Sequence, residues 1–142
     1  MEKSKNIIIS VKDFSISPGP RYVEQGDYSG ELYYHTVLNY EFKTAFEQGV
    51  YLIVNLDGVD GYLSSFLDEA FGNLVYDFGV ENVRQHLEIV SIEEPEWITM
   101  IENDTYSDWE NRRSAQKYPK KTVEHDDWFA FNNGHICIKN IK

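Results

Sequence analysis

The sequence is poor in cysteine, has few basic residues and contains no long hydrophobic run. Its single cysteine, Cys137, excludes an intramolecular disulfide and is typical of a reducing compartment. Thirteen Lys and Arg residues stand against 24 Asp and Glu residues, so the formal net charge is −11. Affinity for phosphate backbones and anionic membrane surfaces comes largely from Lys and Arg. We therefore expect neither nucleic acid nor a membrane as a partner.

The apolar stretches are also too short for a targeting or membrane segment. The N-terminal run "NIIISV" is shorter than the apolar region of a signal peptide. No other run approaches the roughly 20 residues that cross a bilayer as a helix. With 142 residues and 15% aromatic residues, the chain fits one folded domain. These features together predict a cytoplasmic globular protein.

Three short runs rich in aliphatic, often β-branched residues predict strands. They cover residues 6–11, 50–56 and 86–92. The middle run, "VYLIVNL", is almost continuously apolar, which is typical of a central strand covered on both faces. The segment after the first run, "SISPGPRYVEQGDYSG", contains two prolines and three glycines and therefore predicts a loop.

Helical spacing of apolar residues fills the intervals between these runs. The first helix is expected to begin after Ser29 as its N-cap and to stop at Gly49. A second is expected from Ser64 or Ser65, either of which can cap it, to Gly79. Asp68 and Glu69 would then place negative charge in its first turn. A third helix, of mixed charge, is expected to begin near Pro95.

The C-terminal part predicts a β-hairpin over residues 128–131 and 135–139. Its centre is Asn133-Gly134, and this dipeptide favours the type I′ turn because both central residues need a positive φ. Strands that alternate with helices indicate an α/β fold with helices packed on the sheet. The hairpin would add an edge strand, which leaves room for a homodimer.

Three motifs together resemble a small bacterial family, the STAS-like domain of unknown function. The acronym refers to sulphate transporter and anti-sigma factor antagonist domains. The resemblance spans about Phe14 to Pro95. The motifs are Pro18-Gly19-Pro20-Arg21, Ser29-Gly30-Glu31, and the run from Leu56-Asp57-Gly58 through Gly61-Tyr62 and Ser64-Ser65-Phe66-Leu67 to Glu69-Ala70-Phe71-Gly72.

The resemblance implies a mixed β-sheet with helices packed on it. It implies a STAS-like core over residues 1–95, with residues 96–142 as a helix and hairpin extension packed on the same domain. Members of the family often lie beside histidine-kinase-like ATPase domains, which are therefore the implied protein partner. Anti-sigma factor antagonists are phosphorylated on a serine that corresponds to Ser64, with Ser65 as its neighbour. Leu63 and Phe66 stand where those proteins have aspartate and glycine.

The leading interpretation is thus a non-enzymatic regulatory domain that binds a protein through the region from Gly61 to Gly72, with phosphorylation of Ser64 as a switch. A second is a small-molecule or nucleotide binder that uses the Pro18–Gly30 loop and the helix N-terminus at Ser64. Either way, the candidate contact residues are Arg21, Ser29, Glu31, Asp57, Tyr62, Ser64, Phe66 and Glu69.

Each candidate also has a structural interpretation. Ser64 and Ser65 can serve as a helix cap, and Asp57 can serve as a turn residue. Arg21 can either face an anion or pair with Asp27 or Glu31. The four histidines are dispersed and are not spaced as zinc ligands. We therefore predict no catalytic residue, no metal and no cofactor.

Overall fold

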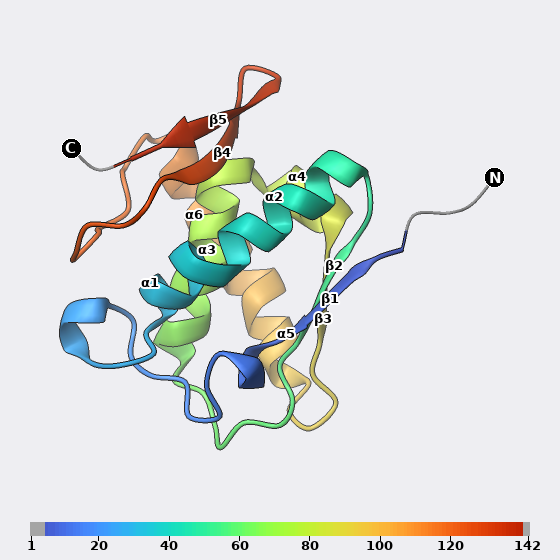
Figure 1. Cartoon of the computed structure of the whole chain (residues 1–142), viewed down its shortest axis with the longest axis vertical. Coiled ribbons are helices and arrows are strands. Elements are labelled where there is room, and N and C mark those ends of the chain that lie inside the picture. The colour runs from blue at the N-terminus through green and yellow to red at the C-terminus, as the bar shows by residue number, and fades with distance from the viewer. Residues whose placement is uncertain (1–4, 141–142) are drawn as a thin grey trace.

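The computed structural model describes residues 5–140. Within them, a three-stranded sheet carries helices on one side, and a separate two-stranded hairpin lies at the opposite end of the helices from the loops (Figure 1). The α/β prediction with a C-terminal hairpin is confirmed. The strands of the sheet are β1 (Ile7–Ser10), β2 (Leu52–Asn55) and β3 (Leu87–Val90), and the hairpin consists of β4 (Trp128–Asn132) and β5 (His135–Lys139).

The helical segments occupy the predicted intervals except for one short helix, Val80–His86, which follows the predicted stop at Gly79 and was not expected. The α-helices are α1 (Gly30–Tyr33), α2 (Asn39–Gln48), α3 (Ser64–Phe78), α4 (Val80–His86), α5 (Glu96–Met100) and α6 (Tyr106–Ser114). A π-helical turn, η3 (Tyr34–Leu38), joins α1 to α2, and a second, η4 (Ile101–Thr105), joins α5 to α6. The predicted first and third helices are therefore each continuous through a π turn. Two short 3-10 turns, η1 (Val11–Asp13) and η2 (Val23–Gln25), lie in the N-terminal loop region.

All pairing within the sheet is parallel, in the order β1-β2-β3. Ile8, Ile53 and Glu88 are in register across it. A mixed sheet was expected, so this detail needs correction. Each connection between neighbouring strands contains helices, and a helical crossover returns the chain to the same end of the sheet. The antiparallel pair is confined to the hairpin.

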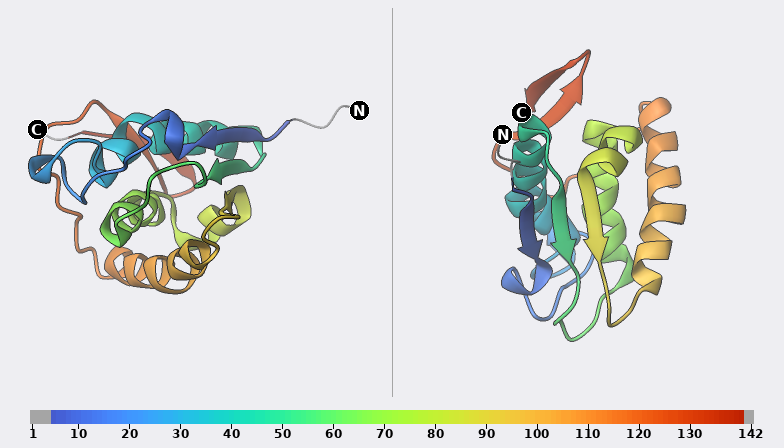
Figure 2. Two further views of the ribbon diagram at one scale, coloured as in Figure 1. Left: turned by 90° about the horizontal axis from the view of Figure 1, so that it is seen from below. Right: turned by 90° about the vertical axis from the view of Figure 1, so that its right-hand side faces the viewer.

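The sheet is covered on one face only, which corrects the expectation for its central strand. Leu52 and Val54 of β2 are buried against the helices. On the outer face Ile8 is 70% exposed and Glu88 is exposed. Figure 2 shows this outer face with no helix over it, because the helices lie on the other side of the sheet. The apolar run of β2 therefore does not mean that both faces of this strand are covered.

The predicted helix limits hold at four of five positions, including Pro95, which is the N-cap of α5. The Ser29 side chain accepts a hydrogen bond from the Leu32 amide, as an N-cap does, and Gly49 ends α2 in the left-handed region at φ 69°. Gly79 ends α3. The N-cap of α3 is Leu63, however, and its side chain makes no cap hydrogen bond.

Ser64 is consequently the first residue inside α3, and the prediction that Ser64 or Ser65 caps the helix is wrong. Asp68 and Glu69 lie beyond the first turn, which contains no acidic residue. The apolar pattern fixed the body of the helix, but the extended backbone of Leu63 at φ −85° and ψ 135° decided where it begins.

Helix α3 is the centre of the molecule. From Phe66 to Phe78 nearly every side chain is buried, including those of Asn73 and Asp77. The other helices, the sheet and the hairpin surround it (Figures 1 and 2). Gly72 lets α6 approach closely, since a Cβ at that position would lie 2.1 Å from the Trp109 ring. Amphipathic spacing predicted the helix but understated how much of it is enclosed.

The hairpin forms at the predicted residues. Trp128 pairs with Lys139 and Asn132 with His135, and both turn residues have positive φ, 52° at Asn133 and 81° at Gly134. Trp128 and Ala130 are buried, because β4 packs on α2 and α3. The hairpin is thus part of the same packed structure as the helices.

Candidate functional site

The loops that follow the three strands meet at the carboxyl end of the sheet. The Asp60 amide donates to the Ile16 carbonyl over 2.7 Å, and the Ser17 hydroxyl donates to the Asp60 carboxylate over 2.6 Å. The Asp57 carboxylate accepts from the amides of Ile92 and Glu93, both at 3.0 Å. These bonds join the first loop to the second and the second to the third. Parallel α/β sheets bind ligands at this end.

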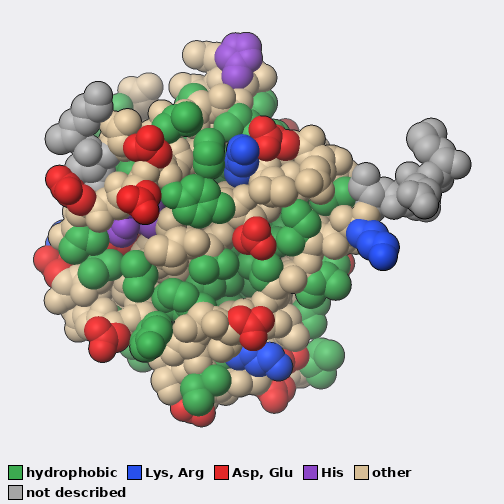
Figure 3. All heavy atoms as spheres, in the orientation of Figure 1, with side chains coloured by type: hydrophobic (Ala, Val, Ile, Leu, Met, Phe, Trp, Pro, Cys, Tyr) green, Lys and Arg blue, Asp and Glu red, His purple; other side chains and the backbone are tan. Residues whose placement is uncertain are grey.

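Three large apolar side chains project from these joined loops. Ile16 is 61% exposed, Leu63 is 54% exposed and Ile92 is 81% exposed. The lower edge of the molecule in Figure 3 shows hydrophobic groups among acidic ones. Asp60 and Glu93 are among the exposed acidic residues of the same loops. We call the surface formed by residues 15–17, 57–65 and 92–94 the carboxyl-edge surface.

Ser64 lies on this surface. It is exposed, and its hydroxyl makes no side-chain hydrogen bond with the described residues. It is the first residue of a 15-residue helix whose N-cap side chain leaves the first amides uncapped. Ser65, the next residue, is half-buried. Of the two predicted phosphorylation candidates, Ser64 is therefore the more exposed.

Other candidate residues near Ser64 hold the loops in place. The Tyr62 hydroxyl donates to the Leu56 carbonyl over 2.7 Å, and burial raises its pKa, so it remains a donor. Phe66 is fully buried among aromatic rings, including those of Tyr33 and Phe14. Asp57 is occupied by two backbone amides. The exposed part of the expected Gly61–Gly72 surface therefore ends close to Ser65.

Arg21 pairs with carboxylates of α3. Its guanidinium donates to Asp68 over 2.8 Å and to Glu69 over 3.1 Å, so the expected pairing with Asp27 or Glu31 is wrong. The second Glu69 oxygen accepts from the Asn73 amide. Burial raises the pKa of Glu69, although the bonds from Asn73 and Arg21 oppose that shift. Two carboxylates already neutralise the cation that an anion pocket would need.

Glu31 lies in a buried cluster with residues more than 90 positions later. Its carboxylate contacts the His125 ring at 2.6 Å and accepts from the Thr122 hydroxyl and amide. It also accepts from the Val23 amide. Burial alone would raise the pKa of Glu31, but the hydrogen bonds from His125, Thr122 and Val23 outweigh it and lower the pKa to about 2. Ser29, the neighbouring candidate, is a buried helix cap.

His35 lies flat against His125, with ring centres 3.8 Å apart. Both of its ring nitrogens are buried and lack a hydrogen-bond partner among the described residues. Burial lowers the pKa of His35 to about 2, and Lys121 and His125 add to the shift. No sequence signal pointed to this pair, because the two histidines are 90 residues apart and share no motif. The burial of Glu31, which requires a partner such as His125, was the feature that could have pointed to this cluster.

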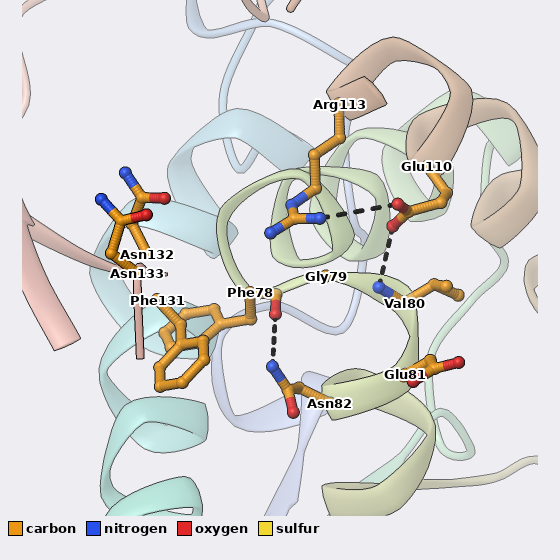
Figure 4. A pocket seen from close by; sticks show the side chains of 10 residues that line it. All are labelled: Phe78, Gly79, Val80, Glu81, Asn82, Glu110, Arg113, Phe131, Asn132 and Asn133. Carbon is orange, nitrogen blue, oxygen red and sulfur yellow. Dashed lines mark hydrogen bonds and ion pairs between the residues drawn. The ribbon is translucent and has the colours of Figure 1, made fainter. Parts of the chain in front are cut away.

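One hollow lies away from all these candidates (Figure 4). It encloses about 520 Å³ between the start of α4, the end of α6 and the hairpin. Arg113 points toward it but lies 3.5 Å from Glu110, which also accepts from the Val80 amide. None of the predicted site residues lines this hollow, whose lining residues are Phe78, Gly79, Val80, Glu81, Asn82, Glu110, Arg113, Phe131, Asn132 and Asn133.

Two kinds of feature are absent from residues 5–140. No group of three or more His, Cys, Asp and Glu side chains has the arrangement of a metal site in this part of the chain. None of the helices described combines the length and the apolar character needed to cross a membrane.

Comparison with protein families adds one match. Residues 36–97 match the model of a STAS-like domain of unknown function. The matched segment contains the run from Leu56 to Gly72, whereas the Pro18–Arg21 and Ser29–Glu31 motifs precede it. No curated protein and no solved structure shows a significant match. Residues 36–97, which include β2, α3 and the loop between them and make up less than half of the chain, are therefore similar to STAS-like domains of unknown function.

Proposed function

We propose that the chain is a non-enzymatic interaction domain that binds a protein partner through the carboxyl-edge surface. The observation that supports this most is the exposure of Ile16, Leu63 and Ile92 on three joined loops. Exposed apolar side chains that gather on one surface mark binding sites more often than single scattered ones do. The acidic residues around them, Asp60 and Glu93, favour a partner with a basic rim.

The partner class in this proposal is a histidine-kinase-like ATPase, which is the partner that STAS-like regulators imply. Phosphorylation of Ser64 would control the complex. A phosphate at the first residue of α3 would be held by free backbone amides and by the helix dipole. It would also put about 1.5 to 2 negative charges next to the exposed Leu63, in the apolar contact of the complex, where burying an unpaired charge is unfavourable. The modified domain would therefore release its partner.

The test is binding of the purified chain to such an ATPase from the same genome, measured by calorimetry. Ile92→Glu should weaken the complex at least tenfold, because it places a charge in an apolar contact. Ile138→Glu is the matched control, since Ile138 is 62% exposed on the hairpin and outside the proposed surface. Equal binding by both variants and the original chain would reject the surface.

The switch is tested separately. Ser64→Glu should weaken the complex, whereas Ser64→Ala should leave it unchanged. Ser107→Glu, at an exposed serine of α6, controls for the added charge. If Ser64→Glu binds as tightly as Ser107→Glu, the phosphorylation part of the proposal fails while the docking surface stands.

The observations do not favour the nucleotide-binding alternative. The cation in the Pro18–Gly30 loop of that interpretation, Arg21, is held by Asp68 and Glu69. The Ser29 hydroxyl is likewise occupied by the Leu32 amide.

A further inference from the structure

Strand β1 leaves one edge without a neighbouring strand. Among the described residues it pairs only with β2. The Ile7 amide donates to the Tyr51 carbonyl on the β2 side over 3.0 Å. Successive residues of a strand direct their backbone groups to opposite sides, so both backbone groups of Ile8 and the amide of Ser10 face the free edge, whereas the carbonyl of Ser10 belongs to the N-cap of η1. Such an edge is a template for a further strand.

A groove runs beside this free edge. It encloses about 350 Å³ and is lined by Ile8, Ile9, Ser10, Asp13, Phe14, Tyr33 and Val37. One wall is β1 and the other belongs to α1 and η3, which carry Tyr33 and Val37. Most of these side chains are apolar, and Ile8 is 70% exposed. A strand added to β1 would have a place for an apolar side chain in this groove.

The Tyr33 side chain gives a second, independent observation. It is fully buried, and its hydroxyl has no hydrogen-bond partner among the described residues. A buried polar group without a partner is uncommon and calls for an explanation. Burial raises the pKa of Tyr33, and the charges of Glu41 and Asp13 add to the shift. The hydroxyl is therefore a donor that lacks an acceptor in the wall of the groove.

The charge beside the groove is acidic. Asp13 lines it, and Glu41 lies near enough to Tyr33 to influence its ionisation. Lys12, the adjacent cation, extends toward Gly58 on the β2 side instead. The groove and its rim thus suit a segment that combines apolar side chains with lysine or arginine.

We propose that the free edge of β1 binds an extended, basic segment of a partner protein as a fourth strand, with an apolar side chain of that segment in the groove. The backbone of β1 supplies the hydrogen bonds, and the groove selects the side chains. This surface is separate from the carboxyl-edge surface, so either can fail without the other.

The test uses a seven-residue peptide of alternating lysine and valine, capped at both ends, and the full chain labelled for NMR. Binding should shift and protect the amides of Ile8 and Ser10, which face the edge. The amides of Ile7 and Ile9, which face β2, should change less. A peptide with proline at its central valine should not bind, because it cannot complete the ladder. A peptide of alternating glutamate and valine should bind at least tenfold more weakly.

Variants of the chain test the groove. Ile8→Lys should abolish binding of the basic peptide, and Asp13→Asn should weaken it roughly two- to fivefold. Asp104→Asn, at an exposed residue of η4, removes the same charge elsewhere and should have no effect. The proposal is overturned if the Ile8 and Ser10 amides do not respond to the peptide. It is also overturned if they are already protected in a dimer of the free chain, because a second copy then occupies the edge.

Discussion

Gly72 shows how one missing side chain sets the distance between two helices. The five-membered ring of the Trp109 indole lies where a Cβ at position 72 would be, with its Cε2 atom 2.1 Å away. Trp109 is 1% exposed, and its ring nitrogen donates to Asp68. The indole is therefore fixed by packing on one side and by a hydrogen bond on the other.

Gly72→Ala should lower the free energy of unfolding by about 1–3 kcal/mol, because the new methyl group forces α3 and α6 apart. Urea unfolding followed by tryptophan fluorescence measures the change. Gly61→Ala is the matched control: a Cβ there meets nothing within 4 Å, so stability should stay within about 0.5 kcal/mol. Equal effects of the two substitutions would contradict the close packing.

His35 links stability to pH at the scale of one residue. The folded state lowers its pKa from 6.5 to about 2 through burial. Below pH 6.5, His35 therefore binds a proton in the unfolded chain but stays neutral in the folded chain. The stability contributed by neutral His35 is complete above pH 6.5 and is lost as the pH falls toward the folded value.

The original chain should therefore lose about 1.4 kcal/mol per pH unit more than His35→Phe does between pH 6 and pH 4.5. Denaturant unfolding across this range measures both slopes. His135→Gln, at an exposed histidine of the hairpin turn, should keep the slope of the original chain. Parallel slopes for the original chain and His35→Phe would show that His35 takes up its proton in the folded state.

At the scale of elements, the residue that begins α3 is a poor helix cap but suits a binding surface. Leu63 has the extended backbone of an N-cap but no side-chain acceptor, and it is 54% exposed. An exposed leucine at a cap position contributes little to the fold. Its presence agrees with a role on the carboxyl-edge surface, since sites of function often depart from the residue that stability would favour.

Leu63→Asp should raise the free energy of unfolding by about 1 kcal/mol, because aspartate can cap the first amides of α3. The same change should weaken the partner complex, because it removes one of three exposed apolar side chains. Leu63→Ala separates the two effects: it should weaken binding without raising stability. Thermal unfolding and calorimetric binding are the measurements. A stabilised Leu63→Asp variant that binds fully would remove Leu63 from the surface.

At the scale of the whole molecule, the C-terminal part provides the partners of buried carboxylates on the helices. The Glu31 carboxylate forms hydrogen bonds with His125 and Thr122, and the Asp77 carboxylate forms an ion pair with Lys139 at 3.1 Å. Both carboxylates are buried. Removing one partner of a buried ion pair is strongly destabilising because the other charge is left uncompensated.

A chain that ends at residue 117 should consequently show no cooperative thermal transition, although it retains the sheet and all the helices. Circular dichroism and calorimetry test this. Ile138→Thr in the full chain, an exposed change on the same hairpin, should melt like the original. A cooperative transition in the shortened chain would show that the expected core of residues 1–95 and its helix fold without the hairpin.

Much of the fold could be predicted from local patterns. Apolar spacing located the helical segments other than α4, and aliphatic runs located β1, β2 and β3 to within a few residues. Ser29 and Asn133-Gly134 gave correct predictions because a cap and a type I′ turn depend on residues a few positions apart. The site was less predictable: Ser64 is exposed, as a switch would need to be, but Phe66 is buried and Glu69 binds Arg21.

The sequence by itself therefore determined the elements, the hairpin turn and the STAS-like segment, since each depends on residues close together in the chain. Only the tertiary structure decided that no helix covers the outer face of the sheet and that α3 is buried on nearly all sides. The tertiary structure also brought His125 to Glu31 and Lys139 to Asp77. The reason is physical: a buried carboxylate requires a partner, but nothing in the local sequence states from which distant segment that partner comes.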